Sequence, residues 1–295
     1  MHSNRTLRDA GKEISLFDQR FARSVCWRVN RIQEPNTMNI ITLTTDFGMD
    51  DWFVGSMKGV ILGINPQAVV VDITHEVPGG NIHAAAFALL ASYRCFPKDT
   101  IHVAVVDPGV GTSRAAIAVR TNDYIFIGPD NGILSLALAQ EPVSEIRRLD
   151  HSQYFHKPLS HTFHGRDVFA PVAAHLTLGV PLKDMGVELG KYVQLPWPQA
   201  SMRDGAVHGE VVYIDHFGNA ITNIAAADLA KLARHAPSVL LRSEEVCAVK
   251  NYYQEVANGE LLAVIGSSGF LEIAINGGHA ARALGLRLGE SVEVK

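Results

Sequence analysis

The sequence predicts an α/β protein whose N-terminal domain holds a mainly parallel sheet flanked by helices, with a smaller, mostly β C-terminal domain. From residue 38 to about 191, short apolar segments alternate with helix-like segments, the pattern of strand–helix–strand units. These strands are apolar on both sides, as expected where helices cover both faces of a sheet. After residue 205, short strands separated by turn residues are typical of a smaller β domain.

The predicted elements define the domains. In the first part, the sequence predicts strands at 40–44, 68–73, 101–106, 115–120 and 124–127, and helices at 52–64, 81–96, 132–139 and 168–178. In the second part, it predicts strands at 208–215, 220–224, 261–265, 271–275 and 290–294, and one helix at 225–235. We therefore expect an α/β domain at 38–195, a proline-containing linker at about 196–204 and a β-rich domain at 205–295. Residues 1–37 mix both charges without periodicity, so we expect a disordered leader.

Composition excludes several classes of protein. The 295 residues are 47% hydrophobic and 19% charged, which is enough for a sizeable core. The net charge of −4 argues against a nucleic-acid binder. No run of about 18 apolar residues occurs, so no membrane span is expected. The three cysteines are far apart and form no disulfide framework, which makes the cytoplasm the simplest compartment.

Two segments carry the residues that most resemble a catalytic site. The first runs from Val105 to Arg114 and places Asp107 where a buried strand ends, at the edge of the sheet where α/β proteins bind ligands. The second, residues 161–171, supplies His164 just before a helix-like stretch. Together they suggest an Asp/Arg/His site. An ordinary Asp-Pro-Gly turn and a surface salt bridge are the alternatives.

Several other motifs are compatible with either a ligand-binding role or a structural role. Asp46 follows the first strand and can hold a ribose diol or cap the next helix, and Asp51 can hold an ammonium group or favour the helix dipole. The Asp-Phe-Gly triplet at 46–48 lacks the other kinase motifs. The histidines fail every usual zinc spacing, so we expect no catalytic metal. In the second domain, the turns at 215–223 and 267–278 are either plain hairpins or ligand-binding turns.

Taken together, these motifs resemble the S-adenosylmethionine hydroxide adenosyltransferase family, which is related to fluorinating and chlorinating enzymes. The resemblance covers nearly all of residues 38–295 and rests on five motifs in order: TTDFG, VDPGVGTSR, GPDNG, FHGRD and DHFGN followed by TN. It implies hydrolysis of S-adenosylmethionine to adenosine and methionine without a cofactor. It also implies a homotrimer, with each active site at the interface between the first domain of one subunit and the second domain of its neighbour.

The resemblance also implies roles for individual residues. It places the catalytic triad on Asp107, Arg114 and His164, whereas the halogenating relatives carry tyrosine at the position of Asp107. It places substrate binding on Asp46, Asp51, Asp215, Phe217, Asn219, Tyr253, Ser268, Asn276 and Gly277, with a shift from Tyr253 to Tyr252 left open.

The chemistry fits these residue types, and two other functions remain as alternatives. Methionine leaves the sulfonium as a neutral thioether, so the task of the site is to aim one water at C5′ and take its proton. The first alternative is a halide adenosyltransferase of the same fold. The second is a sensor that binds S-adenosylmethionine or adenosine without turning it over.

Overall fold

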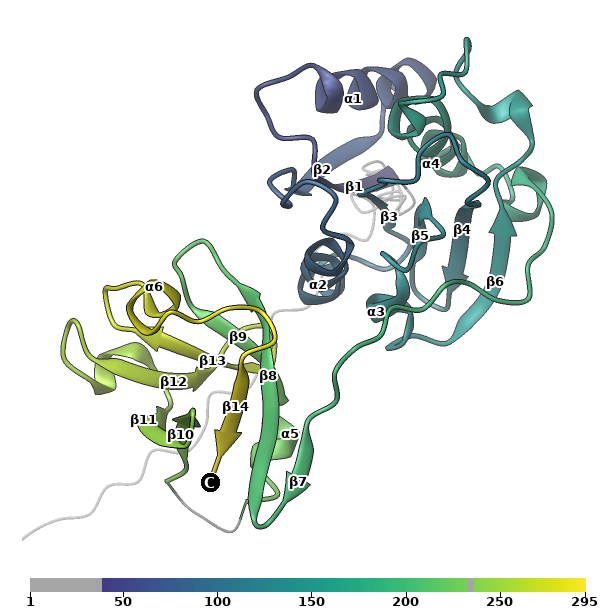
Figure 1. The fold of residues 1–295 in the computed structure, drawn as a ribbon. Helices are drawn as coiled ribbons and strands as arrows, with labels where there is room; N and C mark the ends of the chain where they lie inside the picture. The colour runs from purple at the N-terminus through teal and green to yellow at the C-terminus, as the bar shows by residue number, and fades with distance from the viewer. Residues whose placement is uncertain (1–38, 233–235) are drawn as a thin grey trace, which may run out of the picture. The chain divides into compact units, whose positions relative to one another are not determined.

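The computed structural model describes residues 39–232 and 236–295 (Figure 1). The leader expected at residues 1–37 lies outside the described residues. The strands assemble into two separate sheets, one between residues 40 and 148 and the other between residues 201 and 294.

The first sheet has six strands in the order β2-β1-β3-β5-β4-β6. The neighbours β2-β1, β1-β3 and β3-β5 are parallel, whereas β4 runs antiparallel to both β5 and β6. The sheet is therefore mainly parallel, as the sequence predicts. The strand bounds are β1 Ile40–Thr45, β2 Val69–Thr74, β3 Ile101–Val105, β4 Ala116–Thr121, β5 Ile125–Pro129 and β6 Val143–Arg148.

Helices cover both faces of this sheet. Side chains alternate along a strand, so Val103 and Val105 pack in one core with α1 and α4, while Ala104 and Val106 pack in the other with α2 and α3. This double coverage explains why β3 is buried throughout. The helix bounds are α1 Phe53–Ile64, α2 Ile82–Ser92, α3 Ser135–Leu138 and α4 Ala170–Thr177.

The second sheet has eight strands in the order β14-β10-β11-β12-β13-β9-β8-β7, and a further pairing of β14 with β8 closes it into a barrel. Apolar side chains from these strands fill the barrel core, among them Val211, Leu271 and Ile273. The bounds are β7 Ser201–Arg203, β8 Ala206–Ile214, β9 Ala220–Ala225, β10 Ser238–Leu241, β11 Glu244–Lys250, β12 Leu261–Ile265, β13 Phe270–Ile275 and β14 Ser291–Val294, with short helices α5 Ala226–Leu229 and α6 Ala280–Leu284.

The predicted fold class is confirmed, but several elements differ. The helix expected at 225–235 is limited to the single turn α5, which ends at Leu229 and has no fully buried residue; positions 233–235 lie outside the described residues. In place of the helix expected at 132–139, the structure has only the single-turn helix α3. The sequence analysis missed β6, β7, β10, β11 and α6, and β7 lies inside the expected linker. The exact domain boundaries remain predictions.

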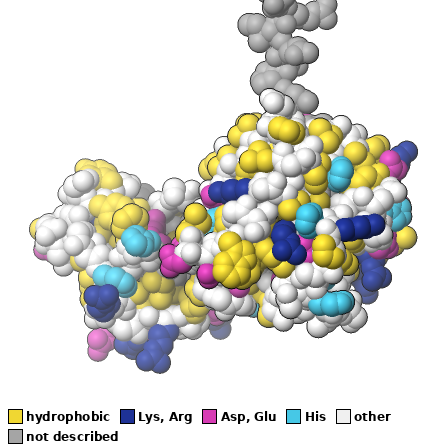
Figure 2. All heavy atoms as spheres, turned by 90° about the horizontal axis from the view of Figure 1, so that it is seen from above, with side chains coloured by type: hydrophobic (Ala, Val, Ile, Leu, Met, Phe, Trp, Pro, Cys, Tyr) yellow, Lys and Arg dark blue, Asp and Glu magenta, His cyan; other side chains and the backbone are white. Residues whose placement is uncertain are grey.

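Surface features agree with the composition. On the face shown in Figure 2, lysine and arginine side chains are interspersed with acidic ones instead of gathering into one basic patch. Within the described ranges, no helix is both long enough and apolar enough to cross a bilayer.

Candidate active site

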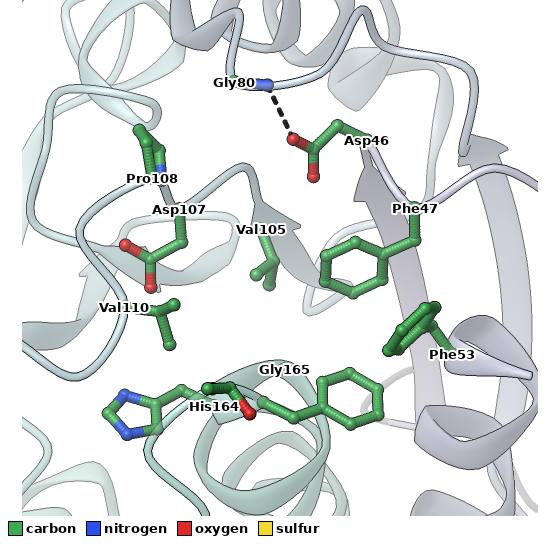
Figure 3. Close-up of a pocket in the computed structure, with 12 residues that line it drawn as sticks. Asp46, Phe47, Phe53, Gly80, Val105, Asp107, Pro108, Val110, His164 and Gly165 are labelled. Carbon is green, nitrogen blue, oxygen red and sulfur yellow. Dashed lines mark hydrogen bonds between the residues drawn. The ribbon is translucent and has the colours of Figure 1, made fainter.

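A pocket of ≈ 430 Å³ lies at the edge of the first sheet where β1 and β3 end (Figure 3). The two strands are parallel neighbours, so the residues that follow them, Asp46 and Asp107, meet at the same edge. The close-up shows the Asp107 carboxylate and the His164 ring on one side of the pocket and the rings of Phe47 and Phe53 on the other. The lining residues are Asp46, Phe47, Phe53, Gly80, Val105, Asp107, Pro108, Val110, Thr162, Phe163, His164 and Gly165.

Arg114 joins Asp107 to His164 in one hydrogen-bonded cluster. Its Nε donates to Asp107 Oδ1 at 3.0 Å, and its Nη2 donates to Asp107 Oδ2. The same Nη2 lies 2.9 Å from His164 Nδ1. The side chains of Asp107 and Arg114 are only 5% and 12% exposed, so this charged pair is largely shielded from solvent. The structure therefore brings together the three residues that the sequence singled out.

The protonation of His164 follows from this arrangement. A guanidinium group has only donors, so His164 Nδ1 must accept from Arg114. The ring is then neutral and carries its proton on Nε2. Burial lowers the pKa of His164, and the charge of Arg114 lowers it further, which also favours the neutral ring.

A glycine lets the segments that carry Asp107 and His164 approach each other. Gly111 has φ +79, in the left-handed region, and a Cβ at this position would overlap the carbonyl oxygen of His161. The loop that carries Asp107 and Arg114 therefore lies directly against the segment that leads to His164. No residue with a side chain fits here without moving one of the two segments.

The segment at residues 161–171 contributes His164 to the candidate site and also contains an internal anchor. Asp167 is fully buried, and its carboxylate accepts from Arg166 Nε at 2.6 Å and from the backbone N–H of Ser160 at 2.7 Å. Arg166 and Asp167 thus pair with each other and fix the loop before α4. A five-residue π-helix, Gly165–Phe169, connects this loop to α4, as often happens at functional sites.

A buried histidine supports the turn that carries Asp46. Asp46 Oδ2 accepts from the backbone N–H of Gly80 at 2.8 Å. Thr45 Oγ1 accepts from the N–H of Phe47 at 3.2 Å and lies 2.8 Å from Nδ1 of His75, a side chain only 3% exposed. His75 Nε2 faces Asp72 Oδ1 at 3.0 Å without a well-aligned hydrogen bond. His75 therefore holds the pocket turn in place, a role that its sequence context did not reveal.

The positions of the histidine, cysteine and acidic side chains bear on whether the protein could hold a metal ion. Among residues 39–232 and 236–295, no group of three or more His, Cys, Asp or Glu is placed to hold a metal ion. Asp51, which the family resemblance assigns to substrate binding, is exposed and does not line the pocket.

A second cluster of candidate residues forms in the barrel. Asp215 Oδ1 accepts from the backbone N–H of Asn219 at 2.8 Å, and Oδ2 accepts from Asn219 Nδ2 at 2.9 Å. The same Nδ2 lies 3.4 Å from the hydroxyl of Tyr253, whereas Tyr252 is 58% exposed. This contact places Tyr253, and not Tyr252, beside Asn219. Phe217 projects from the turn and is 72% exposed, so its ring is free to stack on a ligand.

The remaining candidates lie at the ends of β13. Ser268 is half-buried in the turn between β12 and β13. Asn276 donates from Nδ2 to the carbonyl of Val256 at 3.0 Å, and Gly277 follows with φ +71. None of the barrel candidates lines the pocket that holds Asp107 and His164. The substrate-binding roles assigned to these residues remain predictions.

Comparisons with known proteins decide the family. A model of the SAM hydroxide adenosyltransferase N-terminal domain matches residues 41–186, and a model of the C-terminal domain of the same family matches residues 209–293. The chain belongs to this family. The expected resemblance is therefore confirmed, and both parts of the chain are accounted for by family domains.

Several relatives of the SAM hydroxide adenosyltransferase family match over nearly their full lengths. A protein from Salinispora tropica named (R)-S-adenosyl-L-methionine hydrolase is 41% identical over 86% of this chain and 97% of its own. A protein of the same name from Thermus thermophilus is 36% identical over 87% and 100%. A fluorinase from an Actinoplanes species is more distant, at 26% identity over 86% and 97%. The crystal structure of an uncharacterized conserved protein from Thermotoga maritima has a TM-score of 0.83 and 41% identity, over 86% of this chain and 99% of that one.

Proposed function

We propose that this protein hydrolyses S-adenosyl-L-methionine to adenosine and L-methionine. The observation that carries the proposal is the Asp107–Arg114–His164 cluster, which lies at a pocket that also holds Asp46. The names of the relatives support the same reaction, since those at 35–41% identity are hydrolases of this substrate.

The reaction is an in-line displacement at C5′ of the ribose. A water oxygen forms a bond to C5′ while the C5′–S bond breaks, and methionine leaves with the electron pair as a neutral thioether. The leaving group needs no general acid, so catalysis consists of holding the water in line and removing its proton. Fixing a nucleophile in such a geometry can supply several kcal/mol of the barrier, and a pocket that excludes bulk water strengthens the electrostatic contribution.

The hydrogen bonds assign different tasks to the three residues. His164 already accepts from Arg114 at Nδ1, so its Nε2–H is a donor that orients the water oxygen. Asp107 accepts from Arg114 on both oxygens, but a carboxylate offers about four acceptor sites and can still take a proton from water. Arg114 keeps its charge and, through its hydrogen bonds, fixes the positions of Asp107 and His164 relative to each other. We therefore assign the proton to Asp107.

The names of the relatives support one sulfonium epimer of the substrate. The prefix (R) in those names stands beside L-methionine, so it describes the sulfonium centre and not the α-carbon. We propose the same epimer as the substrate here. Asp46 keeps one carboxylate oxygen for the ribose diol, because Gly80 occupies the other.

Three further parts of the proposal rest mainly on the family resemblance. We propose a homotrimer in which the barrel of one subunit supplies Asp215, Phe217 and Asn219 to the pocket of its neighbour. Among the described residues, those that line the pocket fall between 46 and 165, which leaves room for the barrel of a neighbouring subunit in this proposal. We propose that no cofactor takes part, because the sulfonium is already activated. A cytoplasmic location agrees with the sparse cysteines.

Product analysis tests the proposal directly. The purified protein is incubated with each sulfonium epimer, with and without sodium chloride, and the products are separated by chromatography. We expect adenosine and methionine in equal amounts from the (R) epimer, whatever the chloride concentration. Formation of 5′-chloro-5′-deoxyadenosine would instead indicate halide transfer, and calorimetric binding without turnover would indicate a sensor. Asp107→Ala and His164→Ala should lose turnover and keep substrate binding; wild-type rates in either would refute the cluster.

A further inference from the structure

The GPDNG motif at residues 128–132 contains no residue to which the family resemblance assigns a role, and its residues, all of them described, do not line the pocket. The motif starts in the last residues of β5, and β5 lies between β3 and β4 in the sheet (Figure 1). Because β3 and β5 are parallel and β4 is antiparallel to β5, β3 and β5 end at the edge where β4 begins. The loop at residues 106–115, which joins β3 to β4, therefore crosses the end of β5.

Two adjacent residues of the motif bond to the two ends of the 106–115 loop. At the start of the loop, the side-chain Nδ2 of Asn131 donates to the carbonyl oxygen of Val106 at 2.9 Å. At its end, the backbone N–H of Asp130 donates to the carbonyl oxygen of Ala115 at 2.9 Å. The two bonded carbonyls directly flank residues 107–114, so they hold the segment that begins with the acid of the cluster and ends with its guanidinium.

The bond from Asn131 to Val106 needs an amide side chain. Asn131 Oδ1 accepts from the backbone N–H of Ile133 at 3.2 Å, which fixes the turn and leaves Nδ2 as the donor toward the loop. Val106 is fully buried, so its carbonyl oxygen requires a donor from the protein. A carboxylate at position 131 could accept from Ile133 but could not donate, and it would leave the carbonyl of Val106 unpaired.

The turn is itself held firmly, so it can serve as a fixed support for the loop. Gly128 lies so close to β3 that a Cβ there would overlap the carbonyl oxygen of Ala104. Ser135 Oγ donates to the carbonyl oxygen of Gly132 at 2.6 Å, which ties the end of the motif to α3. Because these contacts fix the turn from the strand side and from the helix side, a displacement of the loop relative to the turn requires loss of the bonds to the loop ends.

We propose that Asn131 is a positioning residue, which holds Asp107 at the distance from His164 that the reaction needs. Asn131 does not touch the reacting atoms and acts through the backbone of the 106–115 loop. This inference rests on the proposed function, because the water that attacks C5′ must meet both side chains at once. A displacement of about 1 Å far from the reacting atoms can cost as much as 10²-fold in rate.

Asn131→Asp tests the inference, because it keeps the size and the acceptor of the side chain and removes only the donor. We expect kcat for adenosine release to fall at least about 10-fold. KM should change less than about twofold, because the loop places the water and not the nucleoside. If Asn131→Asp does not fold, Asn131→Ala removes the same donor without adding a charge and decides the question with the same measurements.

Asn65→Asp is the matched control for a loss of stability. Asn65 is buried at the end of α1, outside the pocket lining, and is held by the same kind of bonds. Its Oδ1 accepts from the backbone N–H of Gln67 at 3.0 Å, and its Nδ2 donates to the hydroxyl of Thr177 at 2.9 Å. This variant should lower the melting temperature and keep the wild-type kcat. A similar loss of kcat in both variants would show that the rate follows stability, and would overturn the inference.

A double variant distinguishes positioning from an independent structural role. If Asn131 acts through the loop that carries Arg114, the combination of Asn131→Asp with Arg114→Lys should lose less kcat than the product of the two single losses. Losses that multiply in full would contradict the inference.

The ring of His164 provides a readout that needs no turnover. Its ¹⁵N NMR signals are assigned by their absence in His164→Gln, and they report the hydrogen bond that Nδ1 accepts from Arg114. We expect Asn131→Asp to shift the Nδ1 signal and Asn65→Asp to leave it in place. An unchanged signal, or an unchanged kcat, in Asn131→Asp overturns the inference. If the wild type releases no adenosine, the proposed hydrolysis fails, while the NMR comparison still decides whether Asn131 positions the cluster.

Discussion

Replacing Arg114 with lysine should disable the cluster while leaving the charge in place. Arg114 donates to three acceptors: both oxygens of Asp107 and Nδ1 of His164. A lysine ammonium is a point donor that cannot span these positions, so at least two of the three bonds are lost. A hydrogen bond to a charged group contributes about 1.5–3 kcal/mol. If two such bonds act in the transition state, about 3 kcal/mol is lost, which corresponds to roughly a 10²-fold lower kcat.

The assay is the initial rate of adenosine release at saturating substrate, followed by chromatography. We expect kcat to fall and KM to change little, because the cluster acts on the water and not on the bound nucleoside. Arg242→Lys, which alters an exposed arginine paired with Glu290, serves as the control and should keep wild-type rates. A kcat for Arg114→Lys within threefold of the wild type, or a parallel loss of adenosine binding, would refute the reasoning.

Three further predictions follow from the pKa shifts and from a glycine. Burial and the charge of Arg114 lower the pKa of His164, so kcat should stay constant as pH falls from 8 to 6.5 and should decline only below pH 6.5. A fall in kcat centred above pH 6.5 would contradict a neutral His164 ring. Burial lowers the pKa of His102 from 6.5 to about 3, so below pH 6.5 the unfolded chain binds a proton that the folded chain does not. Between pH 8 and pH 5 this group should remove about 2 kcal/mol of stability, and urea titrations of His102→Leu should lack that pH-dependent loss. Gly111→Ala should lower kcat and destabilise the fold by about 1–3 kcal/mol, whereas Gly63→Ala on α1, where space is open, should be neutral or stabilising in thermal melts.

The position of the two acids of the candidate site could be predicted because of how parallel strands end. Asp46 and Asp107 each follow a buried apolar strand, and such strands are the clearest signal in an α/β sequence. Their carboxyl ends meet at one edge, so two acids distant along the chain were expected near each other. The position of His164 beside Arg114 depends on Gly111, whose close contact with His161 no spacing rule reveals. The family motifs assigned Asp107, Arg114 and His164 to one site. The hydrogen bonds among them, and the tautomer of His164 that follows from these bonds, could be found only from the structure.

Two of the missed strands, β6 and β11, have a weak hydrophobic signal. In β6 only Ile146 is buried, because this strand lies at the edge of the sheet and faces solvent along most of its length. In β11 one residue, Cys247, is buried, and exposed glutamates begin the strand. Hydrophobic periodicity indicates which side chains are buried. A strand that is stabilised mainly by backbone hydrogen bonds therefore shows only a weak pattern in the sequence. The barrel could therefore be predicted as β-rich, but its closure through β14 and β8 could not.

Glu272 shows a different limit of sequence reasoning. Within the apolar run of β13, a single glutamate resembles the solvent-facing residue of an ordinary half-buried strand, and alternation alone would place it in water. The structure buries it instead, beside Gly266 and within the electrostatic reach of Asp215. The charge of Asp215 adds to burial in raising the pKa of Glu272. Both effects come from residues on other strands and turns, so no pattern within β13 alone could predict them.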